Sequence, residues 1–145
     1  KIIEIANAVG YENQGKFASV FAKEYAEALA QTTGMVVCIT DHDQVVAASG
    51  QGSRELIGKM ISRELDRVIT EREMKCVHTG ERKLLPLVEN QKDCVSELII
   101  QPIICAGDAI GAVALMGKGI GEKFGNPEQM LVKTAAGFLG RQMEQ

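Results

Sequence analysis

One glycine-rich stretch has the residue types that bind phosphate. Residues 107–119 read GDAIGAVALMGKG, an apolar run that ends in glycines and a lysine and precedes a helix-like segment. A strand, a glycine-rich turn with a lysine and then a helix is the layout that holds phosphates in nucleotide enzymes. The spacing does not fit, because Gly111 and Gly117 have five residues between them instead of four and Gly119 replaces the magnesium-binding hydroxyl. We therefore interpret the stretch as a hairpin strand, and Gly111 as a point where another backbone or a ligand comes close.

Metal-binding and catalytic motifs are equally weak. The run Asp41-His42-Asp43 offers metal ligands, but a calcium loop would need glycine where Val46 stands, so we predict the polar tip of a hairpin. The four cysteines form no CxxC pair, which argues against structural zinc and favours a reducing compartment. No serine lies in a nucleophile-elbow context. We predict a protein that is not an enzyme and uses no metal or cofactor.

Composition limits the remaining classes. The chain has 145 residues and a net charge of −3, with acidic and basic residues intermixed. That length fits one domain, and that charge pattern does not favour nucleic-acid binding by this chain itself. No apolar run approaches the roughly 20 residues that a membrane span needs. We expect a cytoplasmic protein that does not contact a membrane.

Hydrophobic periodicity predicts the elements that would position any site. Residues 1–15 are weakly patterned and predict a linker or helical lead-in, and residues 16–145 predict a single domain. The order helix, hairpin, helix, strand, hairpin, helix predicts an α+β fold, with an antiparallel sheet covered on one face by the terminal helices. The predicted helices are 16–33, 57–70 and 127–143, and the predicted strands are 35–40, 45–49, 83–88, 95–105 and 110–118.

The first and last helices each carry an apolar stripe. These stripes must be covered by the sheet, by each other or by another copy of the chain. Besides burial in the domain's own core, and compatible with it, the stripes can take part in a helical bundle between copies, which predicts a dimer or a tetramer. The residues we assign to this interface are Phe17, Phe21, Leu131 and Phe138.

Four stretches resemble one known family. They are FAKEYAEAL (21–29), CITDHDQVVAASG (38–50), QPIICAGDAIGAVAL (101–115) and TAAGFLGRQMEQ (134–145). In the same order, they are similar to the C-terminal domain family of stage V sporulation protein T. The resemblance implies a GAF-type domain, and it implies an N-terminal DNA-binding domain of the AbrB type that this sequence lacks. Such regulators act in sporulation, and their GAF domain is taken to sense a small molecule and to help hold the oligomer together.

The resemblance also gives a place for an effector. We expect a pocket on the sheet face away from the terminal helices, covered by helix 57–70 and the segment 80–95. The cyclic-nucleotide signature of other GAF domains is not found, so the small-molecule effector is unknown. The alternative is a structural interaction module whose pocket is filled by its own side chains. Candidate ligand-binding residues are Ser49, Ser53, Arg54, Arg82 and Cys105.

Overall fold

The computed structural model describes residues 11–78, 85–91, 97–117 and 124–144. Its helices are α2 (Tyr11–Thr33), α3 (Arg63–Glu71) and α4 (Asn126–Met143), with a short 3-10 turn η1 (Arg54–Leu56). Its strands are β1 (Val36–Asp41), β2 (Val45–Ser49), β3 (Lys75–Val77), β4 (Glu97–Cys105) and β5 (Asp108–Gly117). The helix α2 already starts at Tyr11, inside the segment for which we predicted a linker or a helical lead-in.

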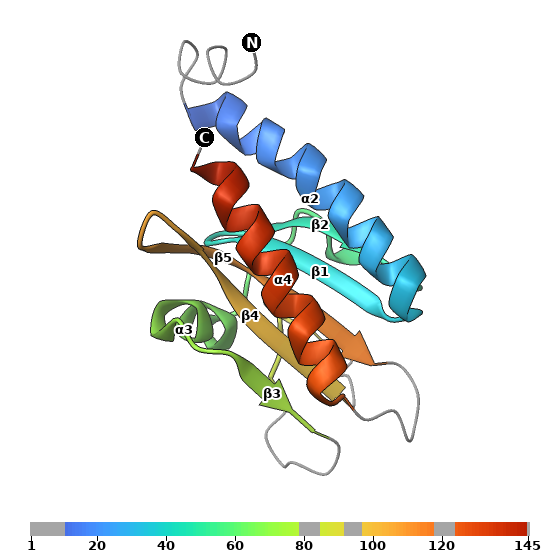
Figure 1. The fold of residues 1–145 in the computed structure, drawn as a ribbon. Helices are drawn as coiled ribbons and strands as arrows, with labels where there is room; N and C mark the ends of the chain where they lie inside the picture. Colours follow the sequence, from blue (N-terminus) through green and yellow to red (C-terminus); the bar gives the residue numbers. More distant parts are fainter. Residues whose placement is uncertain (1–10, 79–84, 92–96, 118–123, 145) are drawn as a thin grey trace.

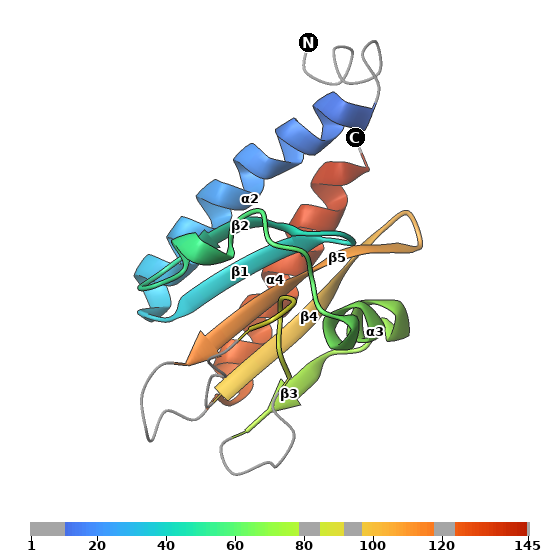
Figure 2. The same cartoon turned by 180° about the vertical axis from the view of Figure 1, so that it is seen from behind.

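In the described part of the chain, the strands form one sheet in the order β2-β1-β5-β4-β3. Every neighbouring pair is antiparallel, which confirms the predicted α+β class. Helices α2 and α4 cross one face of the sheet side by side (Figure 1). Helix α3 lies on the opposite face, as Figure 2 shows from behind. The terminal helices therefore share one face, as expected.

Alternating side chains of the strands build two separate apolar layers, because successive residues of a strand point to opposite faces. We call the side under α2 and α4 the helical face and the opposite side the lid face. The strands contribute Val37, Ile39, Ala47, Ile99, Ile103, Val113 and Leu115 to the helical face. They contribute Val36, Cys38, Val45, Leu98, Ile100, Ala112, Ala114 and Met116 to the lid face.

Helix α4 lies close against the β4–β5 hairpin. A Cβ on Gly140 would collide with the carbonyl oxygen of Ile104, so only glycine permits this approach. One turn further, the Glu144 carboxylate accepts a hydrogen bond of 2.8 Å from the backbone N–H of Ala106 at the hairpin tip. The end of the helix and the tip of the hairpin are thus joined at two points.

Both predicted hairpins are confirmed, and the role of Gly111 is resolved. Gly111 pairs with Asp41 of β1, and a Cβ there would collide with the carbonyl oxygen of Thr40. The glycine is therefore needed because a neighbouring backbone comes close. No room for a ligand at Gly111 is required to explain it.

The predicted helix 57–70 is too long at its N-terminal end. The helix begins at Arg63, after Ser62 caps it by accepting a hydrogen bond of 3.0 Å from the Leu65 N–H. Ile57 and Ile61 have helical spacing but lie outside it, and Gly58 has a φ of +85° that a helix excludes. This segment instead turns at residues 57–58 and then runs along the edge of β2. The Gly58 N–H donates to the Val45 carbonyl at 2.9 Å, and the Val45 N–H donates to the Lys59 carbonyl at 3.0 Å.

The predicted edge strand at 83–88 is wrong in its described part. Residues 85–88 contain only an isolated bridge between Ile61 and Val88, and residues 83 and 84 lie outside the described part. The edge strand is β3, which pairs with β4 from Lys75↔Ile100 to Val77↔Leu98. Leu87 and Val88 are buried as the apolar pattern suggested, but they pack on the lid face rather than extending the sheet.

Two glycines of α4 provide a matched test of its docking. We expect Gly140→Ala to lower the free energy of unfolding by roughly 1–3 kcal/mol, because the new methyl group meets the Ile104 carbonyl. A Cβ on Gly137 meets nothing within 4 Å, so Gly137→Ala should raise it by about 0.5–1 kcal/mol through helix propensity. Urea denaturation of both variants measures the difference. Equal effects of the two substitutions would contradict the close contact.

Candidate functional site

The cover of the lid face is one hydrogen-bonded unit made from two segments. We call α3 together with residues 57–62 and 85–91 the lid. The Ser62 N–H donates to the Leu87 carbonyl at 2.9 Å, and the Ser62 hydroxyl donates to the carbonyl of Pro86. The Glu89 N–H donates to the Met60 carbonyl at 3.0 Å. Both segments are therefore linked, and movement of one would carry the other.

Apolar side chains fill the contact between lid and sheet. Leu65 of α3 is completely buried, and small residues lie on the central strands β1 and β5 below the lid. The lid contributes Ile61, Leu65, Val68, Ile69, Leu87 and Val88 to this layer. The described part of the layer contains no buried charged side chain.

Thr40 contributes a polar side chain to this apolar layer. Every second residue of β1 points to the same face, so the Thr40 side chain lies on the lid face with Val36 and Cys38. Thr40 is 2% exposed. Its neighbours across the sheet are Val45 and Ala112, which also belong to the lid face. The Thr40 hydroxyl oxygen has no hydrogen-bond partner among the described residues.

Three of the predicted ligand-binding residues lie together at the end of β2. Ser49 is the last residue of β2 and Arg54 is the exposed first residue of η1. Ser53 between them is buried, but its hydroxyl donates to the Gly50 carbonyl at 2.7 Å. The Ser53 hydroxyl therefore closes a local turn.

The other two candidates are not part of that group. Cys105 pairs with Asp108 at the hairpin tip, whereas Ser49 aligns through β1 and β5 with Ile99 at the far end of β4. Six residues of β4 separate these positions, about 20 Å at the usual rise of a strand. Arg82 lies outside the described residues. The structure thus brings Ser49, Ser53 and Arg54 together and places Cys105 elsewhere.

The thiols of Cys38 and Cys105 are not poised as nucleophiles. Complete burial of Cys38 on the lid face raises its thiol pKa to about 12, so it stays protonated and packs as an apolar group. The pKa of Cys105 is also raised, first by partial burial and then by the carboxylates of Glu144 and Asp108. Thiolate chemistry is therefore disfavoured at both positions.

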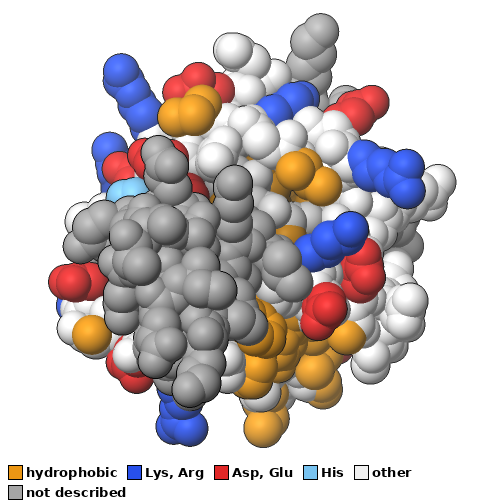
Figure 3. Space-filling view, turned by 90° about the horizontal axis from the view of Figure 1, so that it is seen from above, with side chains coloured by type: hydrophobic (Ala, Val, Ile, Leu, Met, Phe, Trp, Pro, Cys, Tyr) orange, Lys and Arg blue, Asp and Glu red, His pale blue; other side chains and the backbone are white. Residues whose placement is uncertain are grey.

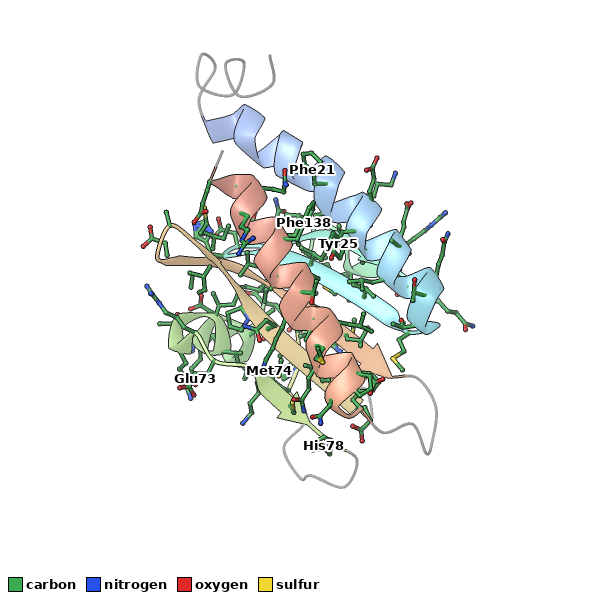
Figure 4. All side chains as sticks on the ribbon, viewed as in Figure 1. Phe21, Tyr25, Glu73, Met74, His78 and Phe138 are labelled. Atoms are coloured by element: carbon green, nitrogen blue, oxygen red, sulfur yellow. The ribbon has the colours of Figure 1, made fainter. Side chains whose placement is uncertain are left out.

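A buried carboxylate lies at the other end of the sheet. Glu97 begins β4, is 2% exposed, and has its Oε2 atom 2.9 Å from the Nδ1 atom of His78. His78 directly follows β3 and is half exposed (Figure 4). The pair belongs to the helical face, because Glu97 lies two residues before Ile99 and therefore points to the same face of the sheet. It is therefore separate from the lid face.

The acidic run at 41–43 forms the hairpin tip that we predicted. The Asp41 carboxylate accepts hydrogen bonds of 2.7 Å from the backbone N–H groups of Asp43 and Gln44. This is how an aspartate closes a turn between two strands. Asp41, His42 and Asp43 could hold an ion by distance alone. His42 and Asp43 are exposed and Asp41 is partly exposed, and the turn explains their arrangement.

The candidate interface residues lie along α2 and α4. Phe21, Tyr25 and Phe138 approach one another between the two helices (Figure 4). The rings of Tyr25 and Phe138 are 5.1 Å apart, centroid to centroid. Phe21 and Leu131 are half-buried against the helical layer. Phe17 lies in α2 before the point where its side chains are described.

Part of this surface remains apolar and exposed. Met130 is 67% exposed and Phe138 is 39% exposed, eight residues apart on the same side of α4. Thr134 and Gly137 between them are exposed and uncharged. Apolar side chains also gather near the lower edge of the molecule when it is seen from above (Figure 3).

Two positions that shape the lid face were missed from the sequence. Ser62 joins the two parts of the lid, and the signal was available in its place before Glu64 and the apolar positions of α3. Thr40 lies within an apolar strand, and the sequence carries no sign that its hydroxyl lacks a partner.

Among the described helices, none is long and apolar enough to cross a bilayer.

Comparison with known proteins identifies the family of this chain. A family model described as "Stage V sporulation protein T C-terminal, transcription factor" matches residues 18–144. Stage V sporulation protein T of Bacillus subtilis (strain 168) is 39% identical over 125 residues, which are 86% of this chain and 68% of that protein.

Solved structures agree on the fold. The cofactor-binding GAF domain of the nutrient sensor CodY from Clostridium difficile aligns with a TM-score of 0.63 at 18% identity, over 81% of each chain. Residues 122 to 287 of a methyl-accepting chemotaxis protein align with a TM-score of 0.73 at 18% identity, over 86% of this chain and 87% of that one. The chain therefore belongs to the family of stage V sporulation protein T C-terminal domains, transcription-factor domains with the GAF fold.

Proposed function

We propose that this domain is a non-catalytic sensor of a small molecule and an oligomerisation module within a transcription regulator. The observation that carries the proposal is the unequal covering of the sheet. Two long helices close the helical face, whereas the nine-residue α3 and irregular segments close the lid face. A short cover held by few elements can open locally at a lower cost than a long packed helix.

A route to the rest of the regulator follows from the contacts of α4. Strands β4 and β5 form part of the lid face, and their hairpin tip is joined to the end of α4 through Glu144 and Ala106. The end of α4 and the start of α2 lie at the same end of the molecule (Figure 1). A ligand that favours one lid position would bias this hairpin and thereby the two helix ends.

DNA recognition would belong to another domain of the regulator. The family is described as a transcription factor, yet this chain has a net charge of −3 and intermixed charges. We therefore propose an N-terminal DNA-binding domain of the AbrB type, connected through the start of α2, in a cytoplasmic regulator of sporulation. The GAF domain would set the spacing and orientation of the DNA-binding domains.

The second candidate is a purely structural module with no ligand. It is favoured by the apolar lid layer, in which Leu65, Leu87 and Ile100 are almost fully buried. Such a module would still assemble through α2 and α4. The two candidates differ in whether any small molecule stabilises the lid.

We expect the protein to bind a metabolite under the lid. A thermal-shift panel of nucleotides, amino acids and other metabolites should include a compound that raises the melting temperature, because binding to the folded state alone stabilises it. Hydrogen exchange should then slow in residues 57–71 more than in α4, which serves as the internal control. A panel with no stabilising compound and an unchanged lid would support the structural module instead.

Assembly should depend on the exposed side of α4. We expect Met130→Glu to weaken self-association at least about tenfold, because it places a charge in an apolar interface. Met60→Glu is the matched control, since Met60 is 50% exposed and lies in the lid. Sedimentation velocity at micromolar concentrations measures both. A monomeric wild-type protein, or equal behaviour of the two variants, would contradict the proposed interface.

A further inference from the structure

The hydroxyl of Thr40 lacks the compensation that buried polar groups normally have. Its oxygen is inaccessible to solvent and has no hydrogen-bond partner in the described structure. The hydroxyls of the buried serines Ser53 and Ser62, by contrast, have partners. The Ser53 hydroxyl donates to the Gly50 carbonyl. The Ser62 hydroxyl donates to the Pro86 carbonyl and accepts from the Leu65 N–H. A buried hydroxyl without a partner costs free energy, so its retention needs a reason.

The surroundings of Thr40 show from which side a partner would come. The residue pairs with Val45 on β2 and with Ala112 on β5, and all three side chains lie on the lid face. Pro102 is the next residue across the sheet, opposite Ala112. Side chains around the hydroxyl on the sheet are therefore apolar and mostly small, and any partner must lie between the sheet and the lid.

The charge of this layer limits the class of partner. Among the described residues, Glu97 carries the buried carboxylate, and it lies on the helical side beside His78 rather than in this layer. A ligand carboxylate or ammonium group enclosed under the lid would have no opposite charge among the described residues of the layer. Burying an unpaired charge is far more costly than burying a neutral polar group.

We propose that Thr40 is the hydrogen-bonding anchor for an uncharged, mainly aliphatic ligand under the lid. The ligand carries one neutral polar group, such as an amide, a carbonyl or a hydroxyl, and either a donor or an acceptor can pair with the threonine hydroxyl. This inference rests on the proposed sensing function and assigns its chemistry. The small residues Ala112 and Ala114 and the buried apolar side chains of the lid contact the aliphatic part.

The test uses three compounds with related aliphatic bodies. Isovaleramide is neutral, isovalerate carries one negative charge, and isoleucine carries both charges. Dissociation constants are measured by NMR titration of methyl resonances in the 145-residue chain. We expect isovaleramide to bind more tightly than isovalerate or isoleucine. Thr40→Val, which removes the hydroxyl and keeps the shape, should weaken isovaleramide binding roughly tenfold.

Thr70→Val is the control variant. Thr70 lies on α3, is exposed, and donates its hydroxyl to the Asp66 carbonyl at 2.9 Å. We expect it to leave isovaleramide binding unchanged and not to raise the melting temperature. Without added compound, Thr40→Val should raise the melting temperature, because it removes an unpaired buried hydroxyl.

The outcomes separate this inference from the proposed function. Unchanged isovaleramide binding in Thr40→Val, a lower melting temperature of that variant, or tighter binding of isovalerate or isoleucine would overturn the role of Thr40. If a charged metabolite from the wider panel stabilises the wild type and Thr40→Val equally, sensing stands and the anchor is refuted. If neither isovaleramide nor any panel compound binds, both proposals fail.

Discussion

The structure depends on the burial of one central strand on both of its faces. Every residue of β5 from Gly111 to Gly117 is buried, so this part of the strand contacts water on neither face. A strand of this kind can be stable only if two separate apolar layers cover it. The two helices at the ends of the chain supply one layer, and residues from the middle of the chain supply the other.

The two layers meet this demand in different ways. On the helical face, the packing is tight enough that Gly140 accepts no side chain beside Ile104. On the lid face, two short segments are tied to each other by the hydrogen bonds of Ser62, Leu87 and Met60. This asymmetry suits the function proposed above, in which one face fixes the assembly and the other responds to a small molecule.

The elements that were predictable are those whose own residues specify them. The two hairpins combine β-branched runs with polar turns, and the terminal helices have long apolar stripes that leave little ambiguity. The beginning of α3 was misassigned because Ile57 and Ile61 have helical spacing by coincidence, while Gly58 and the Ser62 cap decide the backbone. The short strand β3 was missed because three residues carry too little pattern, and it forms through pairing with β4.

The candidate site was less predictable, for a physical reason. Ser49, Ser53 and Arg54 are neighbours in sequence and stay together in the fold, whereas the position of Cys105 depends on the register of three strand pairs. Whether a hydroxyl such as that of Thr40 finds a partner depends on everything that packs against it. Residue type and spacing do not contain that information.

The residues that run beside β2 also affect how copies of this protein can meet. Gly58 and Lys59 occupy the hydrogen-bonding groups of Val45, so an incoming strand from another molecule finds that part of the sheet edge already taken. At the other edge, β3 is only three residues long. An added strand from a second molecule is therefore disfavoured at both places, so copies of the protein are less prone to join sheet to sheet.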